Sequence, residues 1–205
     1  MNAAQFSCGD FLDALASKSP TPGGGGASAL VGALGAALAS MVGNYTLGKQ
    51  KYAGVEAEIR ALMVRTEELR TRLLAQVDAD AAAFEPLSRA YAIPKDDPAR
   101  GEVMERCLRE AAAPPMEILR LSCQAIDLHQ AMLEKGSSMM LSDIGTGVVF
   151  CWRALYGALL NVKVNTKSMS DREYAGAMNA EADALAEKYG KIARQVYESV
   201  MGRYS

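Results

Sequence analysis

The sequence predicts an all-α protein, built as an up-and-down bundle of long helices. Apolar residues recur every three or four positions through almost every segment, and no segment shows the apolar/polar alternation of a half-buried strand. Proline, glycine and aspartate mark the connections between these periodic segments. The chain has 205 residues, of which 50% are hydrophobic, enough for one domain with a substantial core. We therefore expect a single helical domain over residues 1–205.

Start and stop signals place the helices of the first half. A short helix is predicted to begin at Ser7, where Asp10 completes a capping-box pattern, and to end before a pair of prolines. A second helix covers about residues 27–48, with glycine and alanine at spacings of three and four that let another helix approach closely. A third, over residues 55–91, presents one continuous apolar face.

The second half is predicted to hold four more helices. One begins near Pro98 and ends at Pro114–Pro115, because proline interrupts the helical hydrogen bonding. The next covers about residues 115–135, and another covers about residues 142–160. The last helix opens at a capping box that begins with Ser170.

Composition excludes several classes of function. The net charge of -2 and the pI of about 5.6 leave no basic footprint for nucleic acid. The four cysteines are far apart and the N-terminus has no signal-peptide pattern, so we expect free thiols and a cytoplasmic location. A single histidine without paired cysteines predicts no metal site. No cofactor is expected.

The charge-free stretch from Ser19 to Gly48 is long enough to cross a membrane. Glycine and alanine dominate it, however, and they gain little from lipid, so we interpret it as a buried core helix and expect no membrane association. Residues 142–160 form a second segment with almost no charge. Two such helices are hard to cover within one short bundle, which predicts a homodimer or a higher homo-oligomer.

Asp80 is the first candidate for chemistry, since it is the one charged residue on the apolar face of residues 55–91. An isolated carboxylate there costs several kcal/mol unless it is paired or protonated. Its pKa should rise if burial dominates and fall if a cation is near. The spacing leaves two interpretations open: a functional acid, or a structural Asp bonded to a neighbouring helix end.

Further candidates lie around the second helix. The run Pro20–Gly26 stands at its start, where glycines and a helix N-terminus favour an anionic ligand, although a turn or a close helix crossing explains the run equally simply. Lys49, Lys51 and Tyr52 follow its end. They either complement the helix dipole or clamp a ligand that carries a carboxylate.

The remaining candidates lie in the second half of the chain. Asp143 is an acid at the start of a helix, where acids are common and need no functional explanation. Asn161 and Asn165 either satisfy the backbone of a loop or hydrogen-bond to the edge of a heterocycle. His129 stands among apolar residues and is expected in the core. No nucleophile–His–Asp arrangement is recognisable from these positions.

Several segments, taken in order, resemble the cyclodeaminase/cyclohydrolase family of one-carbon folate metabolism. They are the Pro20–Gly26 run, Lys49 with Lys51 and Tyr52, the segment Val77–Phe84, and the Ser142–Asp143 helix start. The resemblance covers nearly the whole chain and implies a folate substrate, with the second Asp of the Asp-x-Asp motif, Asp80, as catalytic acid/base. The chain departs from the family pattern over residues 137–140.

The resemblance to free-standing members implies hydrolysis of 5,10-methenyltetrahydrofolate to 10-formyltetrahydrofolate. Deaminating cyclisation of 5-formiminotetrahydrofolate is the alternative, and a non-catalytic oligomerisation module is a more remote one. The glutamate tail is expected near the lysines and the glycine-rich start, and the pterin near Asp143 and the two amides. The substrate-binding residues expected on this basis are Pro22, Gly23, Gly24, Gly25, Lys49, Lys51, Tyr52, Asp143, Asn161 and Asn165.

Overall fold

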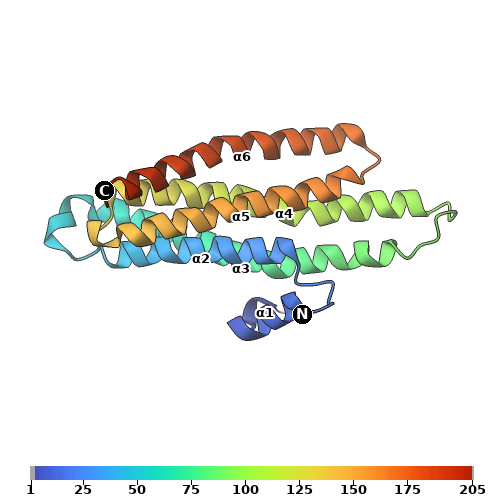
Figure 1. The fold of residues 1–205 in the computed structure, drawn as a ribbon, viewed down its shortest axis with the longest axis horizontal. Helices are drawn as coiled ribbons and strands as arrows, with labels where there is room; N and C mark the ends of the chain where they lie inside the picture. Colours follow the sequence, from blue (N-terminus) through green and yellow to red (C-terminus); the bar gives the residue numbers. More distant parts are fainter. Residues whose placement is uncertain (1–2, 205) are drawn as a thin grey trace.

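The computed structural model describes residues 3–204, and that part of the chain is built from helices and their connections without a strand. Five long helices lie lengthwise in a bundle, and a short one, α1, lies on its outside (Figure 1). The α-helices are α1 (Cys8–Ala16), α2 (Gly24–Asn44), α3 (Glu56–Ala90), α4 (Arg100–Lys135), α5 (Leu141–Lys167) and α6 (Arg172–Met201). Single 3-10 segments occupy Ala3–Gln5, Gln50–Val55 and Ser138–Met140. The all-α prediction is confirmed.

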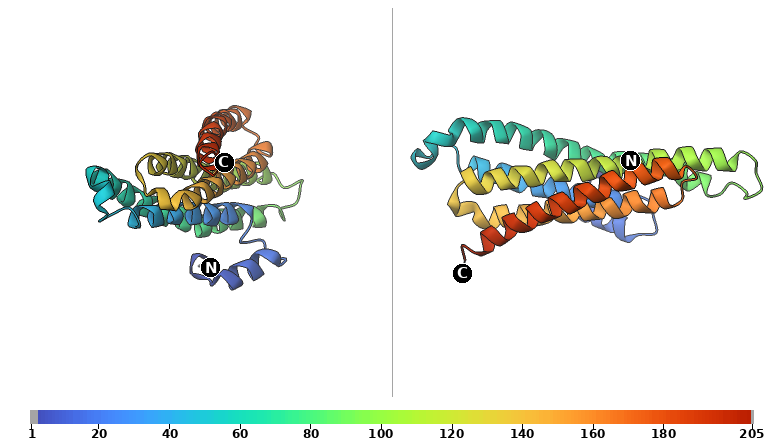
Figure 2. Two further views of the ribbon diagram at one scale, coloured as in Figure 1. Left: turned by 60° about the vertical axis from the view of Figure 1, so that its left-hand side comes forward. Right: turned by 90° about the horizontal axis from the view of Figure 1, so that it is seen from above.

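The helices are arranged so that α2 and α5 share an outer face of the bundle. Figure 2 shows α6 on one side of the molecule, over α4 and α5, and α1 on the opposite side, near α2 and α3. Helix α1 buries Phe11, which lies with Phe6 against Leu30, Leu74 and Val77. This packing holds α1 beside the first turns of α2.

Small residues let α2 pack closely against its neighbours, as its spacing predicted. A Cβ atom added at Gly35 would lie 2.4 Å from the Cys151 sulfur of α5, and one at Gly32 would lie 3.1 Å from Leu73 of α3. Larger side chains at these positions would push the helices apart. The buried small residues of this helix include Gly32, Gly35, Ala36, Ala39 and Gly43.

His129 joins α4 to this crossing from inside the core, where it is 0% exposed. Its Nε2–H donates a hydrogen bond to the Gly35 carbonyl at 3.0 Å, whereas Nδ1 has no partner. Gly147 makes room for the ring, since a Cβ there would lie 2.1 Å from its Cε1. Burial lowers the pKa of His129 to about 4, so the imidazole is neutral at physiological pH.

We expect His129 to make the fold sensitive to mild acid. Its pKa in an unfolded chain is about 6.5, so the unfolded state takes up a proton before the folded state does. The free energy of unfolding should therefore fall as the pH drops from 6.5 towards 4, by about 2 kcal/mol at pH 5, with no contribution above pH 6.5. Urea unfolding at pH 7 and pH 5 tests this, because His129→Gln should lose less stability across that interval than the wild-type chain. Equal losses would contradict the assignment.

The predicted break at Pro114–Pro115 is wrong, because α4 runs unbroken from Arg100 to Lys135. An interior proline costs a helix about 3 kcal/mol. Here both prolines are buried, and the residues after them, such as Ile118 and Leu119, fill the core of the bundle. Burial of that apolar face offsets the lost hydrogen bonds, so tertiary packing overrides the local signal.

Other helix boundaries also differ from the predictions. Helix α2 begins at Gly24 and ends at Asn44, with the chain turning at Gly48, whose φ of 72° favours glycine. Helix α5 continues to Lys167, so Asn161 and Asn165 lie within a helix rather than at its end. Their side-chain amides form hydrogen bonds within a helix or between helices, so they do not satisfy the backbone of a loop.

Among residues 3–204, two helices are long and apolar enough to cross a membrane by length and composition. They are α2, of which 50% of the apolar window is buried, and the segment 138–167 that contains α5, of which 39% is buried. Their buried sides form the centre of the bundle. The expectation that the chain does not associate with a membrane stays a prediction.

Candidate active site

Asp80 lies on α3 beside the first turn of α2. Its Oδ2 accepts a hydrogen bond from the Gly26 backbone N–H at 2.9 Å. The N-cap residue of α2 is Gly23, which has no side chain to cap the helix. A carboxylate from another helix therefore satisfies one of the free N–H groups at the positive end of the α2 dipole.

Glycine at position 25 makes this contact possible. A Cβ atom there would lie 2.2 Å from Asp80 Oδ1 and 2.6 Å from Oδ2. At Gly26 the added atom would meet nothing closer than 3.5 Å, which is ordinary contact. Glycine is thus required at position 25 of the run by the close approach of the Asp80 carboxylate.

Two opposing effects act on the pKa of Asp80. Burial is the larger and raises the pKa above its ordinary value, while the hydrogen bond from Gly26 lowers it by less. Asp80 forms no ion pair within residues 3–204. A carboxylate poised in this way accepts a proton from a substrate more readily than a surface Asp does.

Asp80 opens into a cleft of about 190 Å³. The start of α2 forms one wall, Phe84 of α3 and Val164 of α5 form others, and Ala111 of α4 closes the floor. A second cleft of about 420 Å³ adjoins it across Thr21 and Phe84 and continues along α3. Space for an extended ligand therefore runs from Asp80 along the surface of α3.

Asn161 and Asn165 of α5 line the same cleft. The Asn161 amide N–H donates to the Gly157 carbonyl at 2.8 Å, and the Asn165 amide N–H donates to Ala111 at 3.1 Å and to Asn161 at 3.0 Å. Their N–H groups are thus held by backbone carbonyls. Neither Oδ1 accepts a hydrogen bond from a described residue, which leaves two acceptors for the N–H groups of a ligand.

A second group of predicted site residues lies beyond the other end of α2, and we call it the Lys49 cluster: Lys49, Lys51, Tyr52, Ser137 and Ser138. Lys49 Nζ lies 3.4 Å from Ser137 Oγ, and the Ser138 N–H donates to the Tyr52 hydroxyl at 3.0 Å. Hydrogen bonding with Ser138 lowers the pKa of Tyr52 to about 8. Neither lysine forms an ion pair in the described part of the chain.

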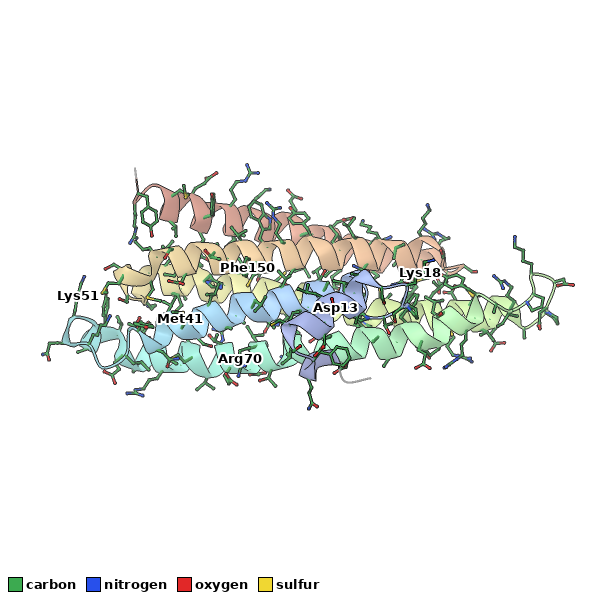
Figure 3. All side chains as sticks on the ribbon, turned by 60° about the horizontal axis from the view of Figure 1, so that its bottom comes forward. Asp13, Lys18, Met41, Lys51, Arg70 and Phe150 are labelled. Carbon is green, nitrogen blue, oxygen red and sulfur yellow. The ribbon has the colours of Figure 1, made fainter. Side chains whose placement is uncertain are left out.

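The predicted site residues therefore fall into two groups. Helix α2 has 21 residues, so its ends, and with them Asp80 and Lys49, are about 30 Å apart. Asp143 starts α5 and stands 18 positions before Asn161, or about 27 Å along that helix. Figure 3 shows Lys51 at one end of the bundle and Lys18, in the connection leading to α2, towards the other.

The structure brings most of the remaining predicted residues to Asp80. Gly23, Gly24 and Gly25 line its cleft. Pro22 is buried beneath the first turn of α2, 3.6 Å from a Cβ placed at Gly26, and does not line the cleft. Within residues 3–204, no group of three or more His, Cys, Asp or Glu could hold a metal ion.

Sequence reasoning missed three wall residues of the cleft. Phe84 stands one helical turn after Asp80, so a search of the same face at the i+4 position would have found it. Val164 follows Asn161 by three positions and carries the same signal. Ala111 carries none, because only the packing of α4 beneath α3 and α5 places it there.

Together, the fold and the cleft define a helical-bundle protein that holds one half-buried carboxylate beside free amide oxygens, in a space suited to a small organic ligand. The chain belongs to the formiminotransferase-cyclodeaminase family, which it matches over residues 7–184. It is 39% identical over 197 residues to a methenyltetrahydrofolate cyclohydrolase of Methylorubrum extorquens, covering 94% of this chain and 95% of that protein.

Two further relatives extend the comparison. A solved structure of a formiminotetrahydrofolate cyclodeaminase from Thermotoga maritima superposes with a TM-score of 0.84 at 30% identity, over 96% of this chain and 98% of that one. The mouse formimidoyltransferase-cyclodeaminase is 33% identical over 165 residues, which is 78% of this chain and 30% of that protein. The chain is therefore an enzyme of the folate cyclohydrolase and cyclodeaminase family.

Proposed function

We propose that this enzyme hydrolyses 5,10-methenyltetrahydrofolate to 10-formyltetrahydrofolate, with Asp80 as general acid/base. The observation that carries the proposal is the half-buried Asp80 carboxylate, held on the start of α2 in a cleft with free amide oxygens. The methenyl bridge between N5 and N10 is cationic, so a carboxylate without a cation partner is complementary to it. The similarity to a protein named as a cyclohydrolase supports this reaction.

The reaction needs one base that becomes an acid. Water attacks the methenyl carbon and forms a C–O bond while Asp80 takes its proton, which gives a neutral tetrahedral intermediate. Asp80 then returns this proton to N5 as the C–N5 bond breaks, and the hydroxyl proton leaves to solvent as the formyl C=O forms. One water is consumed and one proton is released. General acid/base catalysis of this kind raises the reaction rate by about 10²–10⁴-fold.

Pterin recognition is assigned to α5. Asn161 and Asn165 both line the cleft, and neither Oδ1 atom has a donor among the described residues. The Asn161 Oδ1 lies 3.6 Å from a Cβ placed at Gly24, at the start of α2. A reduced pterin carries several N–H groups, which pair with such acceptors. Asp143 lies too far along α5 to contact the same ring from within one chain.

A second candidate reaction uses the same cleft. The solved relative is named as a formiminotetrahydrofolate cyclodeaminase, which closes N10 onto the formimino carbon and releases ammonia. Proton transfer at one carbon between two nitrogens is common to both reactions, and Asp80 serves either. We rank hydrolysis first because the sequence is more similar to the cyclohydrolase, at 39% against 30% identity.

One assay separates these possibilities. The purified chain is incubated with 5,10-methenyltetrahydrofolate and, separately, with 5-formiminotetrahydrofolate, while the methenyl chromophore and ammonia are followed. Loss of chromophore above the buffer rate supports hydrolysis, and its appearance together with ammonia supports cyclisation. No turnover of either compound would contradict the enzymatic proposal and leave the non-catalytic oligomerisation module.

The raised pKa of Asp80 predicts the acid limb of the pH profile. Asp80 must be ionised to take a proton from water, so kcat/KM should fall as the pH drops through a pKa above the ordinary value near 4. The matching measurement is kcat/KM from pH 4 to 8 in buffers of constant ionic strength. An acid limb at or below pH 4 would contradict a desolvated base.

Two further features belong to the proposal. The homo-oligomeric state is supported by the apolar outer face that α2 and α5 share, and a cytoplasmic location is consistent with free cysteines. The residues described hold no candidate metal cluster, and the chemistry assigned to Asp80 calls for no cofactor besides the folate substrate.

A further inference from the structure

We propose that the outer surface between α5 and α6 holds a second ligand site, which binds a small oxyanion such as a carboxylate or a phosphate. Three observations carry the inference: two guanidinium groups without an anionic partner, two neighbouring hydrogen-bond donors without an acceptor, and a glycine that keeps the helices close. The site does not depend on the reaction at Asp80. Its residues, which we call the Trp152 cluster, are Trp152, Arg153 and Tyr156 of α5 and Gly190 and Arg194 of α6.

The Trp152 cluster lies on the side of α5 that faces away from the Asp80 cleft. Nine positions separate Trp152 from Asn161, so at about 100° per residue their side chains leave opposite sides of the helix. Asn161 lines the cleft, whereas Trp152 lies beside Gly190 of α6. Figure 2 shows α6 along this outer side of the bundle. A ligand bound at the cluster therefore leaves the Asp80 cleft open.

Two arginines share the ring of Trp152. The Arg153 Cζ lies 4.4 Å from the ring centroid, and the Arg194 Cζ, which comes from α6, lies 6.0 Å from it. Neither arginine forms an ion pair within residues 3–204. Glu198 stands four positions after Arg194, at the spacing of a helical ion pair, yet the two do not pair. Two like charges over one ring repel each other, and an anion between them relieves this repulsion.

Two uncharged hydrogen-bond donors of the cluster also lack an acceptor. The Trp152 Nε1–H is buried and has no partner. The Tyr156 hydroxyl forms no hydrogen bond within residues 3–204. The Cβ position of an alanine at Gly190 would lie 2.7 Å from this hydroxyl and 3.5 Å from Nε1, so both donors stand beside the same residue of α6. A buried donor without an acceptor costs free energy, which favours a ligand that supplies acceptor oxygens.

Tyr156 controls access to the buried indole N–H. Its side chain is 37% exposed, and its ring lies 6.4 Å from the Trp152 ring, centroid to centroid, at an angle of 55°. Outward rotation of the Tyr156 ring breaks no hydrogen bond, because its hydroxyl forms none. This rotation uncovers Nε1–H for an oxyanion that already lies between the two arginines.

The donors of the cluster determine the class of ligand. Each guanidinium presents a planar set of N–H groups that matches two oxygens of a carboxylate or a phosphate. The indole and the phenol each add one donor. The five residues of the cluster carry no carboxylate that would repel an anion. We therefore expect the site to prefer an oxyanion with two or more oxygens over a spherical halide.

Fluorescence tests the proposal directly, because Trp152 is the one tryptophan of the chain. The full chain is titrated with sodium phosphate and, separately, with sodium glutarate, while sodium chloride keeps the ionic strength constant. At least one of the two should give a saturable change in tryptophan emission. A response to phosphate alone identifies a phosphate site, and a response to glutarate alone identifies a carboxylate site. No saturable response to either anion, or an equal response to chloride, would overturn the proposal.

Matched variants locate the site on the chain. Arg194→Met keeps most of the side-chain length and should weaken binding by about tenfold, since a charged donor is lost. Tyr156→Phe should weaken it by about threefold. The control is Arg65→Met, the same change at an exposed arginine on α3, which should bind like the wild-type chain. Wild-type affinity in Arg194→Met would contradict the assignment.

Thermal unfolding gives a second readout that does not use the fluorophore. A ligand that binds the folded state alone raises the midpoint of unfolding as its concentration increases. The anion that changes the emission should therefore raise the Tm of the wild-type chain and of Arg65→Met, and raise that of Arg194→Met much less. Equal shifts in all three proteins would show a general salt effect and overturn the site.

Discussion

Replacing Asp80 with asparagine is expected to lower kcat/KM for 5,10-methenyltetrahydrofolate by about 10²–10⁴-fold. Asparagine has the same shape and keeps an oxygen that can accept the Gly26 N–H, so the start of α2 should stay in place. It has no basic oxygen to take a proton from water and adds no negative charge opposite the methenyl cation. The loss should therefore appear mainly in kcat.

The matched control is Glu68→Gln, the same chemical change on the same helix. Glu68 is 63% exposed and pairs with Arg72, and such surface pairs contribute little. The kinetics of the two variants decide whether Asp80 takes part in catalysis. Circular dichroism and thermal unfolding check that both variants keep the fold. Asp80→Asn that retains most of the wild-type kcat would remove Asp80 from the mechanism.

Thermal unfolding adds a second test of the same variant. Burial disfavours the charged form of Asp80, so its neutral replacement should leave the stability unchanged or raise it at neutral pH. A group that is retained although it costs stability fits a functional assignment better than a structural one. A large destabilisation would instead favour the structural interpretation, an Asp that caps α2.

Periodicity alone could predict that Asp80 is exceptional, because it is the one acid on a helix face of eleven positions whose other members carry no charge. The group that Asp80 binds could not be predicted in this way. The Gly26 N–H is 54 residues away in sequence, and the contact depends on how α2 crosses α3. Local patterns specify which side of a helix is buried, but the register between two helices follows from packing across the whole core.

The same distinction explains the errors in the helix boundaries. Pro114 and Pro115 carry a strong local signal for a break, yet α4 continues because burial of the flanking core residues outweighs the propensity of two positions. The sequence predicts Asn161 and Asn165 at a helix end, where side-chain amides commonly satisfy the backbone of a loop. In the structure they bond to Gly157 and Ala111, and their oxygens become available to a ligand.

Local sequence patterns also could not predict that the expected site residues would fall into two groups. Gly25 and Lys49 are separated by a single helix, and short sequence separation suggested one binding site. Helix α2 carries the chain about 30 Å from one end to the other, so residues close in sequence lie at opposite ends of the bundle. The resemblance to a family identifies candidate functional residues, but it does not place them relative to one another.

Replacing Gly25 with alanine is expected to lower kcat/KM by about 10²-fold or more, although the substitution adds one methyl group. The new Cβ would lie 2.2 Å from Asp80 Oδ1, so either the carboxylate rotates away or the first turn of α2 shifts. Both movements break the 2.9 Å hydrogen bond from Gly26 and displace the proton acceptor by an ångström or more. Stability should change less, because the higher helix propensity of alanine offsets part of the strain.

Gly26→Ala is the matched control, since its Cβ would meet nothing closer than 3.5 Å and the N–H that binds Asp80 is retained. It should keep nearly full activity and gain up to about 1 kcal/mol of stability from helix propensity. A cycle with Asp80→Asn then isolates the mechanism. If Gly25→Ala acts by displacing the carboxylate, adding it to Asp80→Asn should cost almost nothing more. Losses that multiply would show that glycine at position 25 serves the substrate directly, through the close approach of backbone to folate.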